Sequence, residues 1–242
     1  MRIGILGSGL MAAALGGQWA RAGHHVVVGG RSPSKGAELA EQIGATAGTL
    51  QEATAFGDVT LLAIRAEGIE NTLHAIGAPD GTLSGRPLID CTNAIVPGRF
   101  TLAVPAMAEQ IAHLAVGAHV VKAFNLCAES VWRGAGTSVG PDDDGSVGPG
   151  NVESLGRDAR QEYEGQPLGV PLCGDDPTAL EMVGRLVRDL GCVPVAGGGL
   201  ERAALLEATA AFAIGIWAGG SDTRSLFPTL DRAFGTTPPS RR

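Results

Sequence analysis

A glycine-rich turn near the N-terminus constrains the fold of this 242-residue chain more than any other feature. Residues 7–12 read Gly-Ser-Gly-Leu-Met-Ala, follow a short apolar strand and open a helix that leads to a second strand. This order is the fingerprint of a βαβ unit that binds a dinucleotide. Gly7 permits the tight turn, Gly9 lets the backbone approach a pyrophosphate at the helix N-terminus, and Ala12 allows the helix to pack closely on the strand.

The alternation of strands and helices continues to about residue 132. Because parallel strands need helical crossovers, this alternation indicates a parallel sheet covered on both faces. We therefore predict an α/β fold, namely a doubly wound Rossmann-type parallel sheet with a small C-terminal extension. The expected strands are Arg2–Leu6, His25–Val28, Val59–Ile64, Pro87–Asp90 and His119–Phe124, and the expected helices are Leu10–Ala22, Pro33–Ile43, Ala66–Ile76 and Ala106–Leu114.

The rest of the chain divides into three segments after a dinucleotide-binding core at residues 1–132. Residues 133–167 are rich in Gly, Pro and acidic residues without hydrophobic periodicity, which predicts an inserted loop that is either a lid or a solvated surface excursion. Residues 168–235 are the expected C-terminal α/β extension, and residues 236–242 a disordered tail. Within the extension we expect strands at Leu168–Cys173 and Val193–Val195, a helix at Pro177–Leu190 and an apolar helix at Leu200–Ala218.

The end of the second strand predicts which dinucleotide is bound. A site for NAD carries an acidic residue there to hold the ribose 2′-hydroxyl, whereas this chain has Gly-Gly-Arg-Ser at residues 29–32. Arg31 can form paired hydrogen bonds to a 2′-phosphate, Ser32 can donate one more, and Lys35 adds a positive charge one helical turn away. These residues predict NADP(H) as the cofactor.

Other segments carry a resemblance to one known family. They are Gly30–Lys35, Ile89–Asn93, Val121–Asn125, Gly174–Pro177 and Leu190–Val195. With the fingerprint, they make the chain resemble the NADPH-dependent reductases of the deazaflavin coenzyme F420, also called F420:NADP oxidoreductases. The resemblance covers nearly the whole chain outside the insertion at residues 133–167.

The resemblance implies positions for the cofactor and the second substrate. Ser8 would join the basic cluster at the 2′-phosphate, and the strand ends at Ile64, Asn93 and Asn125 would approach the ribose and the nicotinamide. Residues expected at the cofactor are Gly7, Ser8, Gly9, Leu10, Met11, Arg31, Ser32, Lys35, Ala63, Ile64, Arg65, Asn93, Ala94 and Asn125, and those expected on the substrate side are Asn125, Leu126 and Cys127.

The implied activity is hydride transfer between NADP(H) and a deazaflavin coenzyme. The reactive groups then belong to the two coenzymes, so no residue is assigned as a catalytic acid or base. Family members usually have Thr after Phe-Asn, where this chain has Leu126. An NADPH-dependent reductase of a small imine, enamine or ketone is therefore the alternative, and a non-catalytic NADP-binding sensor is the alternative of another class.

Charge and cysteine content argue against other functional classes. The 18 basic and 25 acidic side chains give a net charge of −7, which disfavours binding to nucleic acid. The four cysteines lack the spacing of a metal site, so no metal is expected. We expect them to be unpaired thiols of a cytoplasmic protein. The uncharged run in the apolar helix is too short to cross a membrane. The apolar surface of this helix predicts instead that two copies of the chain form a homodimer. We expect a cytoplasmic homodimer that acts on a small molecule.

Overall fold

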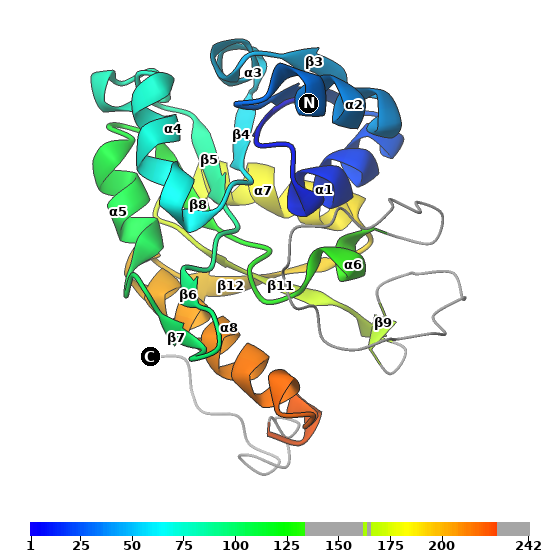
Figure 1. The fold of residues 1–242 in the computed structure, drawn as a ribbon, viewed down its shortest axis with the longest axis vertical. Helices are drawn as coiled ribbons and strands as arrows, with labels where there is room; N and C mark the ends of the chain where they lie inside the picture. Colours follow the sequence, from blue (N-terminus) through cyan, green and yellow to red (C-terminus); the bar gives the residue numbers. More distant parts are fainter. Residues whose placement is uncertain (134–161, 164–165, 227–242) are drawn as a thin grey trace.

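The computed structural model describes residues 1–133, 162–163 and 166–226. An eight-stranded sheet organises the chain, in the order β12-β11-β8-β5-β4-β1-β2-β3 (Figure 1). Its strands are β1 (Arg2–Leu6), β2 (His25–Gly29), β3 (Thr46–Gly48), β4 (Val59–Leu62), β5 (Pro87–Asp90), β8 (His119–Lys122), β11 (Gly169–Cys173) and β12 (Val193–Gly198).

The six strands from β3 to β8 run parallel, as the sequence predicts. From β1 the chain builds outward to β2 and β3, then returns to the other side of β1 with β4, β5 and β8. The order therefore reverses between β1 and β4, and doubly wound sheets bind ligands at the carboxyl ends of the strands beside such a reversal.

Helices cover both faces of the sheet. α1 (Leu10–Arg21), α2 (Pro33–Ile43), α6 (Glu129–Trp132) and α7 (Pro177–Asp189) contribute to one buried cluster, and α3 (Leu50–Phe56), α4 (Ile69–Ala75) and α5 (Met107–Leu114) to the other. Side chains alternate between the two clusters along the inner strands; in β2, Val26 and Val28 lie in the first and Val27 in the second. Both faces are thus buried, which explains the nearly continuous apolar strands.

The C-terminal extension joins the same sheet, with its two strands running opposite to the core strands. β11 meets β8 through one antiparallel bridge, Cys173 to Lys122, and β12 then runs parallel to β11. The predicted parallel sheet is confirmed for the core strands, and the extension, for which no strand direction was predicted, adds two strands that run the opposite way. Between β8 and β11 the described chain contains only the four-residue helix α6 and a short antiparallel pair, β9 (Glu162–Tyr163) with β10 (Gln166–Pro167), and no long crossover helix. An antiparallel strand can begin at the edge where its neighbour ends, so no crossover is needed.

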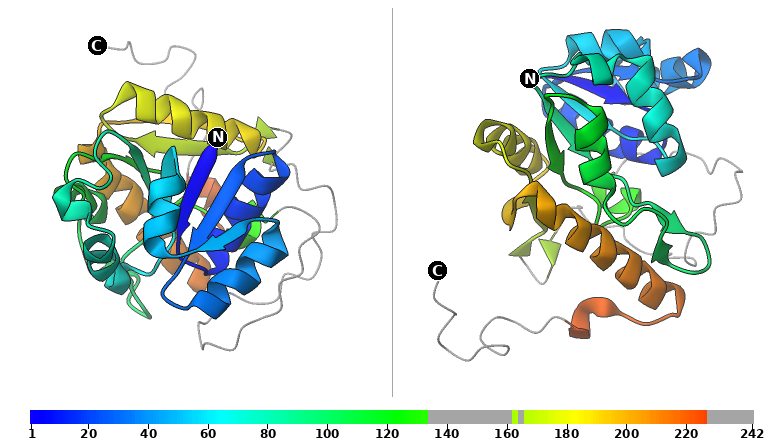
Figure 2. Two further views of the ribbon diagram at one scale, coloured as in Figure 1. Left: turned by 90° about the horizontal axis from the view of Figure 1, so that it is seen from above. Right: turned by 90° about the vertical axis from the view of Figure 1, so that its left-hand side faces the viewer.

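The apolar C-terminal helix lies beyond the carboxyl ends of the strands. The predicted helix Leu200–Ala218 is a 3₁₀ turn, Leu200–Arg202, followed by α8 (Ala203–Ala218). Figure 2 shows α8, in orange, extending outward beside the hairpin of β6 (Ile95–Val96) and β7 (Thr101–Leu102). Most of the predicted insertion at 133–167 and the whole predicted tail at 236–242 lie outside the described residues.

The sequence analysis missed β3, α3 and the β6–β7 hairpin. β3 is three residues long and half-exposed, and α3 is seven residues long, so neither carries a readable period. A capping box starts α3: the backbone N–H of Glu52 donates to Thr49 Oγ1 and the backbone N–H of Thr49 donates to Glu52 Oε2. In the part of the chain that is described, no helix is both long and apolar enough to span a bilayer.

Candidate functional site

The residues predicted at the 2′-phosphate gather where β2 ends. Arg31 and Lys35 are exposed, and Ser32 starts α2 in an extended conformation. A Cβ atom placed on Gly30 would lie 3.4 Å from Oγ of Ser8, so the fingerprint turn directly adjoins this basic cluster. Among the described residues, no side chain caps α2, and its first N–H groups stay available to an anion.

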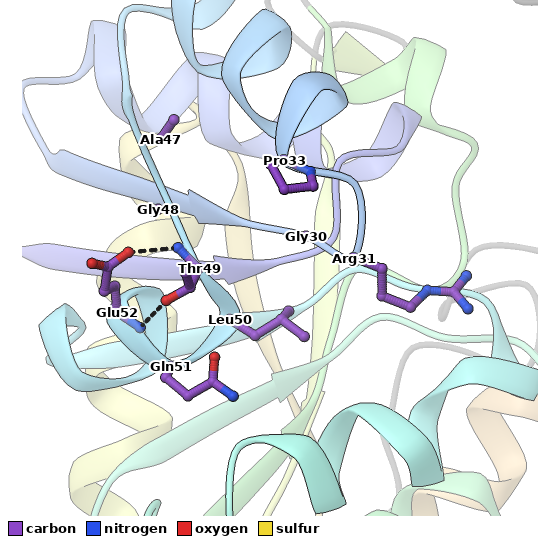
Figure 3. A pocket seen from close by; sticks show the side chains of 9 residues that line it. All are labelled: Gly30, Arg31, Pro33, Ala47, Gly48, Thr49, Leu50, Gln51 and Glu52. Atoms are coloured by element: carbon purple, nitrogen blue, oxygen red, sulfur yellow. Dashed lines mark hydrogen bonds between the residues drawn. The ribbon is translucent and has the colours of Figure 1, made fainter.

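A hollow of about 440 Å³ opens beside this cluster. Gly30, Arg31 and Pro33 line one side, and residues 47–52 line the other. In Figure 3 the Arg31 side chain extends away from Thr49 and Glu52, which are joined to each other by the hydrogen bonds of the capping box. The guanidinium is thus free of that box and can turn toward a ligand at the end of β2.

The fingerprint turn has the geometry that a pyrophosphate requires. Gly7 has φ of 124°, a conformation that favours glycine, and an added Cβ would lie 2.2 Å from the backbone oxygen of Ala63. The loops after β1 and β4 therefore touch. At Gly9 an added Cβ would meet no described atom within 4 Å, and the described residues supply no side-chain cap to α1. The N-terminus of α1 faces open space, where an anion can bind.

The loop after β4 completes this side of the site. Ala63 is 9% exposed, Ile64 is half-buried and Arg65 is exposed. Leu10 and Met11, at the start of α1, are exposed and half-buried respectively. The structure thus brings together the predicted residues that follow β1, β2 and β4.

The two predicted asparagines form a hydrogen-bonded pair. Asn93 follows β5 and Asn125 follows β8, and these strands are parallel neighbours. Asn93 Nδ2 donates to the backbone oxygen of Asn125 at 2.6 Å, and Asn125 Nδ2 donates to Asn93 Oδ1 at 3.1 Å. Asn125 is only 4% exposed, and Thr92 Oγ1 beside Asn93 is buried without a hydrogen-bond partner in the described structure. Unpaired buried hydroxyls are costly, so this end of the site also has capacity for a polar ligand.

An unusual backbone turn delivers Asn125 to this pair. Phe124 has φ of 62°, in the left-handed region, which costs a residue with a Cβ about 1–2 kcal/mol. Its ring is buried edge-on between Trp19, at a centroid distance of 5.9 Å, and Trp132, at 5.5 Å. The aromatic packing holds the turn in place, and nothing in the sequence analysis predicted it.

A buried ion cluster next to the pair was also missed. Lys122 Nζ lies 2.8 Å from Asp90 Oδ2 and 2.8 Å from Glu207 Oε1, and all three side chains are fully buried. Burial alone lowers the pKa of Lys122, but the two carboxylates outweigh it and hold the pKa of the ammonium above its ordinary value. One signal in the sequence could have revealed the cluster, because each residue is a lone charge within an apolar strand or helix.

The predicted substrate side consists of half-buried, largely neutral groups. Leu126 and Cys127 follow the asparagine pair and are both half-buried. Burial raises the pKa of Cys127 to about 11, so its thiol stays protonated at neutral pH and is a poor nucleophile. Within the described chain, no group of three His, Cys, Asp or Glu side chains could hold a metal ion.

Comparison with known proteins finds a family match in the N-terminal part of the chain. Residues 2–94 match the family described as NADP oxidoreductase, coenzyme F420-dependent. The match confirms the recognition made from the sequence and, at the level of the family, the expectation of an NADP-dependent oxidoreductase.

One curated relative extends the similarity over most of the chain. The metalloreductase STEAP3 of Rattus norvegicus is 29% identical over 207 residues, which are 86% of this chain. The chain spans only 36% of the length of that relative.

Solved structures confirm the fold. A protein of Arthrobacter sp. FB24, provisionally described as an F420-dependent NADP reductase, aligns with a TM-score of 0.70 at 22% identity over 90% of this chain and 93% of its own. A reductive aminase of Aspergillus terreus in complex with NADPH4, cyclohexanone and allyl amine gives 0.60 at 20% identity, over 90% of this chain and 62% of its own. At these identities the likeness concerns the Rossmann-like fold alone.

Proposed function

We propose that the chain binds NADP(H) and transfers a hydride between its nicotinamide and a small organic molecule, with a deazaflavin coenzyme as the first candidate. The proposal rests on the contact between the open fingerprint turn and the basic cluster. Ser8 of the turn lies next to Gly30, and Arg31 is the next residue along the chain. The family of residues 2–94 supports it.

The cofactor fits the residues at both ends of the site. Gly9 leaves open space at the start of α1, where the backbone N–H groups would bind the pyrophosphate. Arg31 and Lys35 would neutralise the 2′-phosphate, and Ser32 would donate a hydrogen bond, since among the described residues its hydroxyl caps no helix and contacts only Ser34 Oγ at 3.2 Å. A 2′-hydroxyl would instead leave two cations unpaired, so the site favours the phosphorylated dinucleotide.

At the other end, the protein would orient the reacting ring and exclude water. The bound dinucleotide supplies or accepts the hydride. Among the described residues, each amide of the Asn93–Asn125 pair keeps one N–H beyond those used within the pair, and these could bind a carboxamide or carbonyl oxygen. Phe124, which precedes Asn125, is buried with Trp19 in the core, so the backbone that carries Asn125 rests on a dry support.

The second substrate would lie against Leu126 and Cys127. These half-buried side chains offer an apolar surface with a protonated thiol rather than an acid, a base or a metal. Such a surface suits a flat acceptor that takes up a hydride without receiving a proton from the protein in the same step. A deazaflavin is an acceptor of this kind. An imine or ketone is the second candidate, supported by the resemblance in fold to reductases of the imine class.

An anaerobic assay with defined acceptors tests the proposal. The full chain is incubated with NADPH and oxidised deazaflavin coenzyme, and the deazaflavin absorbance is followed. Parallel reactions contain a cyclic imine or a ketone, and NADH replaces NADPH as the control for cofactor selection. Loss of deazaflavin absorbance with NADPH but not with NADH supports the first candidate. Oxidation of NADPH by the imine or ketone but not by the deazaflavin supports the second. NADPH binding without turnover of any acceptor would contradict the oxidoreductase and favour a sensor.

A further inference from the structure

The ammonium group of Lys122 is completely satisfied inside the protein. Its three acceptors are Asp90 Oδ2 at 2.8 Å, Glu207 Oε1 at 2.8 Å and the backbone oxygen of Thr92 at 2.5 Å. A lysine has three N–H donors, so all of them are used. Lys122 therefore holds three separate elements at one point: the end of β5, the end of β8 and helix α8.

Together, Lys122 and Asp90 fix both polar atoms of the peptide backbone at Thr92. Asp90 Oδ1 accepts a hydrogen bond from the backbone N–H of Thr92 at 2.8 Å, while Lys122 Nζ donates to the Thr92 oxygen. Thr92 directly precedes Asn93, whose side chain binds the backbone of Asn125. Thr92 is therefore the single residue that connects the ammonium group of Lys122 to Asn93 of the asparagine pair.

Glu207 connects the same point to the C-terminal part of the chain. Its Oε2 accepts from the backbone N–H of Met107 at 2.9 Å, and its Oε1 accepts from that of Ala108 at 3.1 Å, so an α8 side chain caps the start of α5. It is the one charged residue within α8. The backbone of Lys122 also forms the only bridge between β8 and β11. The core and the extension meet at this residue.

We propose that Lys122 is a positioning residue, which fixes the Asn93–Asn125 pair through the backbone of Thr92 and, through Glu207, makes that placement depend on the seating of α8. The inference rests on the proposed function, because the asparagine pair is where that function has the nicotinamide and the acceptor meet. The cation itself contacts Asp90, Thr92 and Glu207 and reaches the asparagine pair through the backbone of Thr92.

Stability alone does not account for such a cluster. Removing three charges from water is costly, and apolar side chains of similar volume often replace buried ion pairs with no loss of stability. What apolar side chains cannot do is hold a carbonyl oxygen and an N–H group in fixed directions. The hydrogen bonds to the carbonyl oxygen and the N–H group of Thr92 are the interactions of the cluster that fix the position of Asn93.

The test uses two variants in the full chain, each with a matched control. Lys122→Met removes the cation. Glu207→Gln keeps the size of the side chain and one of its two acceptor oxygens while removing the negative charge, so it is the milder change and carries the test if Lys122→Met fails to fold. Arg188→Met and Glu181→Gln are the controls, since these residues form an exposed ion pair on α7 with an N–O distance of 3.0 Å.

Three readouts separate positioning from general damage. The side-chain ¹⁵N–¹H signals of Asn93 and Asn125 report the pair without any substrate. The dissociation constant of 2′,5′-ADP reports the adenosine end of the site. The kcat and KM for NADPH oxidation report the reaction, at a temperature well below the melting temperature of every variant.

We expect both variants to shift the asparagine signals and to lower kcat by about 10- to 100-fold, the effect of displacing a reacting group by up to an ångström. The 2′,5′-ADP dissociation constant should stay at its wild-type value, and the controls should change nothing. Unmoved asparagine signals, an unchanged kcat, or a loss of 2′,5′-ADP affinity parallel to the loss of kcat would each overturn the proposal. If the wild-type chain reduces no acceptor, the proposed function fails, while the amide signals still decide whether Lys122 positions the pair.

Discussion

The side-chain N–H of Asn93 donates a hydrogen bond of 2.6 Å to the backbone oxygen of Asn125, and the side-chain N–H of Asn125 donates one to Asn93 Oδ1. This exchange joins the loops after two adjacent parallel strands, β5 and β8. A parallel sheet brings such loops together at one edge. Because each amide restrains the other, the pair can present a fixed set of hydrogen-bonding atoms to a ligand.

Loss of the Asn125 amide should therefore impair turnover more than cofactor binding. In Asn125→Ala, we expect kcat to fall by about tenfold or more, since one lost hydrogen bond is worth about 1–1.5 kcal/mol and Asn93 loses the donor to its Oδ1. The dissociation constant of 2′,5′-ADP should not change, because Arg31 lies at the other end of the site. Steady-state kinetics and calorimetry measure the two quantities, with Asn71→Ala on the exposed surface of α4 as the control. Wild-type turnover with every accepted substrate would place the reaction elsewhere.

Selection of NADPH over NADH should depend on the basic cluster at the end of β2. Arg31→Ala should weaken NADPH binding by about 1.5–3 kcal/mol, the usual value of a hydrogen bond to a charged group, and leave NADH binding nearly unchanged. Fluorescence titration with both dinucleotides measures the ratio, and Arg188→Ala controls for the loss of a surface cation. Equal affinities of the wild-type chain for NADPH and NADH would contradict the assignment of Arg31, Ser32 and Lys35.

The sequence predicted the parts of the site that local motifs encode. The fingerprint at residues 7–12 fixes a strand, a turn and a helix together, so the approach of Ser8 to Gly30 follows from chain geometry. The pairing of Asn93 with Asn125 could be expected because both residues follow strands of one parallel sheet. Local pattern and global fold agree at these positions.

Features that depend on distant packing were not predictable in the same way. The left-handed turn at Phe124 requires two tryptophan rings from α1 and α6, and no local propensity favours it. The antiparallel direction of β11 depends on the path of the chain after β8, which hydrophobic periodicity does not report. The Lys122 cluster joins residues up to 117 positions apart along the chain, from Asp90 to Glu207, and only the isolation of each charge hints at it.

The outer face of α8 should be covered by a second copy of the chain. Leu205 is 57% exposed and Phe212 63%, one above the other on this face, whereas the inner face is buried through Glu207, Ala210 and Ala211. Contiguous apolar surface of this kind is uncommon on monomers. We expect light scattering to give the mass of a dimer at micromolar concentration.

Substitutions on this face should shift the chain toward the monomer. Phe212→Glu introduces a charge at the most exposed apolar side chain of α8 and should lower the measured mass toward that of one chain. Val116→Glu, at a residue that is 51% exposed outside α8, is the matched control and should leave the dimer intact. A wild-type mass of one chain would refute the dimer.

Alkaline pH should destabilise the protein through Lys122. Its pKa is raised in the folded state, so below the ordinary lysine pKa of about 10.4 both the folded and the unfolded chain hold the proton, and the stabilisation is complete. Above that value the unfolded chain releases the proton first, and the free energy of unfolding falls as the pH rises through the folded pKa. Urea denaturation between about pH 9 and 11.5 measures this fall.

Comparison with Lys122→Met isolates the contribution of this one ammonium group. The variant leaves two carboxylates buried without their cation, which should cost about 3–5 kcal/mol at neutral pH. Its stability should then fall less steeply than that of the wild type above about pH 10. Cys127 and Cys192 titrate in both proteins and cancel in the difference. Burial raises the pKa of Cys91 and Cys173, and the Lys122 cation lowers it again in part, in the wild type only. The sequence contains only one other lysine, the exposed Lys35, so Lys35→Met serves as the control and should retain the wild-type slope. Equal slopes for the wild type and Lys122→Met would show that Lys122 releases its proton as readily folded as unfolded.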